Sequence, residues 1–185
     1  MRLRTAVFAA VCVLPVLHAQ QPPDPQIIGA FSHISERALR LDPMLQQART
    51  TEWVTKGAPD TYVSQMATTR GQIAAIQADM TELGQHPDHM QDCMKAIFRV
   101  RAFHRSLDSL MGGLRRYQNP ALADLIQSVS AEDEADLDVL QNYVLELANE
   151  KEQEYQVVDR EAQRCRATLS RQPATPPKTT KKTTP

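Results

Sequence analysis

Apolar residues recur at alternating spacings of three and four along most of this chain, and no other feature of the sequence constrains the fold as strongly. The longest regular run consists of Cys93, Ile97, Val100, His104, Leu107, Met111 and Leu114. This heptad spacing places one stripe of side chains along a single helix face. The period-two alternation of a half-buried strand is absent. The sequence therefore predicts an all-α protein, in which His104 lies on the core face beside a hydrogen-bond partner.

Proline, glycine and capping residues divide this pattern into four helical segments. The expected segments are residues 25–56, 60–84, 87–118 and 119–170. Helices that are joined by short connections usually pack as antiparallel neighbours. We therefore expect an elongated antiparallel four-helix bundle with a long last helix. The alternative is a long helical hairpin that dimerises through its last helix.

Single residues predict irregularities within these segments. Pro43 lies inside the first segment, where it predicts a kink or a short break. Pro87 is expected at the first position of the third helix, since proline is favoured there. Gly112 and Gly113 weaken the end of that helix and predict a bend or an early stop. A cap-like sequence before Ala131 predicts a helix restart at that residue.

The last segment carries two apolar seams. The first consists of Leu137, Leu140, Val144 and Leu147, and the second of Tyr155, Val158, Ala162, Cys165 and Leu169. In a strict heptad count the second seam is displaced by one position, so we expect the seam to slip around the helix near residues 148–151. An unbroken helix over residues 120–170 would measure about 75 Å. It must therefore break near Ser130 or project beyond the bundle.

Residues 1–19 are expected to be a signal peptide. Arg2 and Arg4 precede an apolar run from residue 6 to residue 17, and the small Ala19 marks the cleavage site. This is the order of a secretory signal, and the apolar run is shorter than the about 20 residues that span a bilayer. We therefore expect an exported protein with a periplasmic or extracellular location.

The other end of the chain also differs from the helical region, which we expect to cover residues 20–170. Residues 171–185 are rich in Pro, Thr and Lys and contain no large apolar residue. Such a segment cannot offset the entropy of ordering, so we expect a disordered basic tail. The alternative is that this tail has a function, namely weak contact with an anionic envelope polymer or a membrane surface. The whole chain has 21 Lys and Arg against 22 Asp and Glu, and this balance indicates no nucleic-acid partner.

The stretch "HPDHMQDCM", residues 86–94, has the highest density of metal-ligating side chains. His89 and Cys93 lie one helical turn apart, and Met90 and Met94 add thioethers that suit Cu(I). With His86 from the preceding turn, this spacing permits a Cu or Zn site. The competing interpretation is an ordinary helix start with sulfur side chains in the core. The sequence contains no complete motif such as CxxC or HExxH, which favours the helix start.

Cys93 and Cys165 remain after removal of the signal peptide, and an exported protein meets an oxidising compartment. Both cysteines lie on apolar seams, so we expect both to face the interior and to form a disulfide. In a straight hairpin they would lie roughly 30 Å apart along the axis, whereas a disulfide needs Cα atoms within about 7 Å. A separate corner helix over residues 120–129 would reduce this distance. Free thiols and an intermolecular bond remain alternatives.

The sequence predicts no catalytic site and no cofactor. His89 and Cys93 would point outward in parallel from adjacent turns, without a third residue that orients the pair. The acidic cluster Glu132–Asp136 is expected to interact with the helix dipole rather than to bind a cation. We therefore expect a non-enzymatic interaction or scaffold protein of the cell envelope, which binds a protein partner or a second copy through its last helix. An envelope metal-binding protein that uses residues 86–94 is the alternative.

Overall fold

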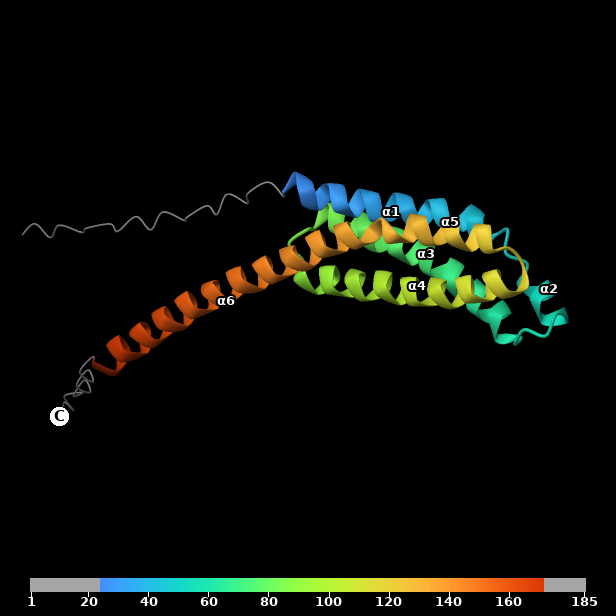
Figure 1. The fold of residues 1–185 in the computed structure, drawn as a ribbon. Coiled ribbons are helices and arrows are strands. Elements are labelled where there is room, and N and C mark those ends of the chain that lie inside the picture. Colours follow the sequence, from blue (N-terminus) through green and yellow to red (C-terminus); the bar gives the residue numbers. More distant parts are fainter. Residues whose placement is uncertain (1–23, 172–185) are drawn as a thin grey trace, which may run out of the picture.

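The computed structural model describes residues 24–171, and these residues are almost entirely helical. The helices are α1 (Pro25–Leu45), α2 (Thr50–Thr55), α3 (Thr61–Gln85), α4 (Met90–Tyr117), α5 (Pro120–Ala131) and α6 (Asp133–Arg171). The predicted all-α bundle of antiparallel helices with a long last helix is confirmed (Figure 1). The predicted signal peptide and the predicted tail beyond residue 171 lie outside the described residues.

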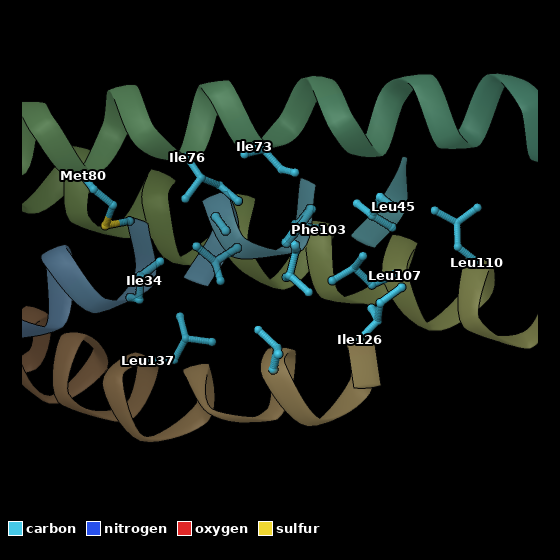
Figure 2. Close-up of a cluster of buried hydrophobic side chains, with 14 of the residues drawn as sticks. Ile34, Leu45, Ile73, Ile76, Met80, Phe103, Leu107, Leu110, Ile126 and Leu137 are labelled. Carbon is cyan, nitrogen blue, oxygen red and sulfur yellow. The ribbon is translucent and has the colours of Figure 1, made fainter. Parts of the chain in front are cut away.

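The bundle core forms where α1, α3, α4 and the α5–α6 pair meet. Ile34 of α1, Ile76 of α3, Phe103 of α4 and Leu137 of α6 point toward one another and are almost completely buried (Figure 2). Helix α3 packs against α1 and α4, while α6 packs against the other side of the same two helices. The apolar stripes that the three-and-four spacing predicted are therefore the surfaces that close the core.

Helix α6 leaves the bundle after Leu147. The first seam, up to Leu147, is buried, whereas nearly every side chain from residue 148 to residue 170 is exposed. We call residues 148–171 the overhang; it spans about 36 Å at 1.5 Å per residue and projects past the bundle end where α1 begins (Figure 1). No helix among the described residues is long and apolar enough to cross a membrane.

The predicted interruption near Ser130 is present but slight. Helix α5 ends at Ala131 and α6 begins at Asp133, close to the expected restart. The residue between them, Glu132, keeps right-handed helical angles, with φ −64° and ψ −19°. The α5–α6 pair is therefore nearly one continuous rod, and its excess length becomes the overhang.

Two expected boundaries are wrong. Helix α1 continues through Pro43 to Leu45, so the expected short break occurs at residues 46–49 instead. Pro43 lies on the exposed side of the helix, where water can bind the carbonyl that the proline leaves unpaired. Helix α4 begins at Met90 rather than at Pro87, because His89 has non-helical angles, with φ −77° and ψ 83°, which interrupt the helix that Pro87 would have started. The chain turns over residues 87–89 before His89 caps the helix.

The glycine pair does not end α4, which continues to Tyr117. A Cβ atom on Gly113 would lie 2.8 Å from Trp53 Cζ3 and 3.0 Å from Tyr62 Cε1. These two rings pack edge to face with centroids 5.6 Å apart. The Trp53 Nε1 atom donates a hydrogen bond of 2.8 Å to Gln118 Oε1, which fixes the indole. Gly113 is therefore a packing residue.

Gly113→Ala should lower the free energy of unfolding by about 1–3 kcal/mol, because the new methyl group meets a buried indole that cannot move away. The matched control is Gly112→Ala, since a Cβ there meets no atom within 4 Å. That control should raise stability by up to about 1 kcal/mol through helix propensity. Urea denaturation followed by circular dichroism measures both. Equal effects of the two substitutions would contradict this account.

Candidate functional site

The residues of the predicted metal segment point in different directions. The rings of His86 and His89 stack with centroids 5.0 Å apart, and both are exposed. Met90 is half-buried against the core, Cys93 is fully buried, and Met94 is exposed. Within residues 24–171, no group of three or more His, Cys, Asp and Glu side chains is arranged to hold a metal ion.

Cys93 has the environment of a core thiol. Its Sγ atom lies 3.4 Å from the carbonyl oxygen of Pro87, to which it donates a hydrogen bond. Burial, together with a smaller effect from the negative charge of Asp92, raises the pKa of this thiol to about 11. Because the thiolate is the form that binds metals and attacks electrophiles, this environment disfavours both reactions near neutral pH.

The predicted disulfide is not formed, and both cysteines are free. The expectation that both face the interior is wrong for Cys165, which is exposed on the overhang. The reason is that α6 has already left the bundle, so the second seam has no core to enter. The two cysteines therefore differ in accessibility as well as in position.

A thiol reagent should distinguish the two cysteines. At pH 8 Cys165 should react at the rate of a free peptide thiol, while Cys93 should react at least about a hundredfold more slowly, because it is buried and its pKa is raised to about 11. Mass spectrometry of trypsin fragments after timed alkylation measures both rates. In denaturant the two rates should become equal. Equal rates in the native protein would contradict the burial of Cys93.

The most buried charged group in the bundle is Asp133, whose exposed fraction is 1%. Arg37 of α1 donates from Nε to Asp133 Oδ1 over 2.5 Å, and His104 of α4 places Nε2 2.9 Å from Asp133 Oδ2. Arg37 also donates from its Nη2 atom to Asp136, one turn farther along α6. Three helices thus meet at one carboxylate on the first turn of α6.

Sequence reasoning found part of this cluster. The acids of Glu132–Asp136 do lie at the start of α6, and His104 has the expected hydrogen-bond partner. The role of Arg37 was missed. The available signal was its position three residues after Ile34 on the buried stripe of α1, where an unpaired charge would be strongly destabilising.

The chemistry of this cluster is structural. Burial lowers the pKa of the Arg37 guanidinium, but its hydrogen bonds with Asp133 and Asp136 outweigh that effect and raise the pKa overall. A carboxylate that holds a histidine is also part of a catalytic triad, but a triad needs a nucleophile at the other ring nitrogen. Here the other nitrogen of His104, Nδ1, lies 3.9 Å from the carboxylate of Glu134. The arrangement pairs charges and supplies no nucleophile.

Asp133→Asn should lower the free energy of unfolding by about 3 kcal/mol, because it leaves a buried guanidinium with one charged partner instead of two. Glu132→Gln is the control, since it removes an exposed ion pair with Arg40 of 2.8 Å only one residue away. That change should cost less than about 1 kcal/mol. Chemical denaturation at pH 7 compares them. A cost below 1 kcal/mol for Asp133→Asn would contradict the proposed structural role.

Exposed apolar side chains gather on α4 and α6. They line an open groove of about 300 Å³ formed by Met94, Ile97, Phe98, Arg101, Gln141, Val144 and Leu145. Phe98 and Leu145 stand exposed at this groove. The groove lies beside the root of the overhang, so apolar surface continues from the bundle toward the projecting helix.

The overhang carries the second apolar seam without a cover. Tyr155, Val158 and Leu169 are 71%, 63% and 67% exposed, and Cys165 is exposed between them. No other segment of residues 24–171 packs on this seam. No protein family, curated protein or solved structure matched the sequence in our comparisons. The candidate functional surface is therefore identified from the geometry of this chain, and it is the seam of the overhang.

Proposed function

We propose that this chain is an exported, non-enzymatic interaction or scaffold protein of the cell envelope, and that the overhang is its contact surface. The observation that carries this proposal is the uncovered seam on residues 155–169. The bundle is complete without the overhang, because the core closes at Leu147. Residues 148–171 therefore add nothing to the core of the bundle. A partner that packs on these residues would explain why they form a helix.

The energetics of the seam support a contact role. Burying one large apolar side chain is favourable by about 1.5–3 kcal/mol. Tyr155, Val158 and Leu169 do not gain most of this free energy, because they are exposed to water. An isolated helix of this length is marginal in water, since most helical stability comes from packing of an apolar face. Binding of a partner to the seam would supply that packing and would bury the exposed side chains.

The location and the minor contacts follow from the sequence. Residues 1–19 have the pattern of a secretory signal, which supports a periplasmic or extracellular location. The basic residues 171–185 support weak contact with an anionic polymer or a membrane surface. The metal-binding alternative has less support, because the side chains of His86, Cys93 and Met94 do not converge.

Site-specific crosslinking tests the contact surface. A photoreactive phenylalanine in place of Val158, in the full-length protein exported by its own cells, should give one defined adduct on illumination. The control position is Thr81 of α3, which is also exposed but lies on the bundle. An adduct with either another protein or a second copy supports the proposal. Identical patterns at both positions, or no adduct at Val158, would overturn it.

A further inference from the structure

The two seams of α6 lie on the same face of the helix. Each residue of the set Tyr155, Val158, Ala162 and Cys165 follows its counterpart in the set Leu137, Leu140, Val144 and Leu147 by 18 residues. Eighteen residues make about five full turns at 3.6 residues per turn. In the heptad count of 3.5 residues per turn, the second seam is displaced by one position, and we therefore expected the seam to slip around the helix. An α-helix has 3.6 residues per turn, and with that period the same displacement keeps both seams on one face.

The overhang also has two halves of opposite charge. Residues 148–159 contain four acids and one Lys, a formal charge of −3, whereas residues 160–171 contain four Arg and one Glu, a formal charge of +3. The halves have equal lengths. A second overhang that lay antiparallel on the first would place each acidic half against a basic half.

We propose that a second copy of this chain covers the seam, and that the two overhangs form an antiparallel two-stranded coiled coil over residues 148–171. This inference rests on the proposed function, since it names the partner of the same surface. The apolar spacing of three and four on residues 155–169 is the spacing that such a coiled coil requires. The opposite charges of the halves provide the complementarity between the copies.

Steric constraints exclude the parallel arrangement. The face of α6 that carries Leu137 and Leu140 is already occupied by α1 and α4. Because the second seam lies on that same face, a parallel second α6 would run directly into these two helices. An antiparallel second α6 that overlaps the overhang would instead meet only the overhang and would end where the bundle begins.

An antiparallel overlap of residues 149–171 of the two copies also gives a consistent register. Tyr155 of each copy lies opposite Cys165 of the other, and Val158 lies opposite Ala162. At the flank of the seam, Glu152 of one copy lies near Arg166 of the other, where an ion pair favours the complex. The two Cys165 residues then lie about 15 Å apart along the axis, too far for a disulfide.

Cysteine crosslinking tests this register. Tyr155→Cys in the full-length protein, with Cys165 retained, should give a covalent dimer under mild oxidation, because the introduced thiol faces Cys165 of the second copy. Gln156→Cys is the control, since that position lies off the seam. The unsubstituted protein should stay uncrosslinked. If the unsubstituted protein forms a covalent dimer through Cys165, and Tyr155→Cys does not increase the amount of covalent dimer, the antiparallel arrangement is overturned.

Analytical ultracentrifugation over about 1–200 µM tests the association itself by mass action. Val158→Glu should weaken dimerisation at least about tenfold, because it buries an unpaired charge in the seam. The control Val157→Glu, at the neighbouring exposed position off the seam, should change it less than about twofold. Added salt should also weaken the antiparallel dimer, because it screens the opposite charges of the halves.

The outcomes separate this inference from the proposed function. A monomer at all concentrations, together with a Val158 adduct to a different protein, would overturn the second copy as partner and leave the contact surface intact. A monomer without any Val158 adduct would overturn both. A dimer that Val157→Glu and Val158→Glu weaken equally would mean that the copies associate elsewhere, which contradicts the proposed coiled coil.

Discussion

The pairing of one buried carboxylate sets the geometry on which the rest of this protein depends. Asp133 is held by Arg37 from α1 and by His104 from α4, at the first turn of α6. A buried charge is strongly destabilising unless it is paired, so Asp133 can be buried at this position only with these contacts. They fix the rotation of α6 relative to its two neighbours at the point where the rod enters the bundle core. Because an α-helix is stiff and regular, this rotation also determines the direction in which every later side chain of α6 points.

The rotation of α6 therefore relates the buried seam in the core to the proposed contact surface on the overhang. The side chains from Leu137 to Leu147 face α1 and α4, and five turns later the seam from Tyr155 onward faces the same direction. The overhang thus presents its apolar side chains toward the space beyond the bundle end. A partner can approach there only as far as the bundle permits, which restricts both its length and its direction. Packing inside the bundle in this way sets the direction in which the seam of the overhang faces.

The residues of the core could be predicted from local sequence patterns, and the predictions that were wrong have physical causes. The stripe from Cys93 to Leu114 was read correctly, because burial on one helix face needs only the three-and-four spacing. Gly113 was misread as a helix breaker, since its packing partners Trp53 and Tyr62 are about 50–60 positions away in the chain. The break expected at Pro43 occurs after Leu45 instead, because the sequence does not tell which side of the helix faces water. The predicted disulfide failed because the seam of Cys165 has no core to enter.

The sequence by itself determined that the chain is helical, where its main turns lie and which residues form its apolar seams, since these depend on spacing and on local backbone preferences. It also determined the charge reversal along the overhang. Only the tertiary structure decided which seam is buried and which is left in water. Both seams have the same spacing, but α1 and α4 begin at the bundle end from which the overhang projects, so the neighbours that bury the first seam are missing for the second (Figure 1). Burial depends on contacts between distant segments, and spacing within one helix cannot encode where its neighbours stop.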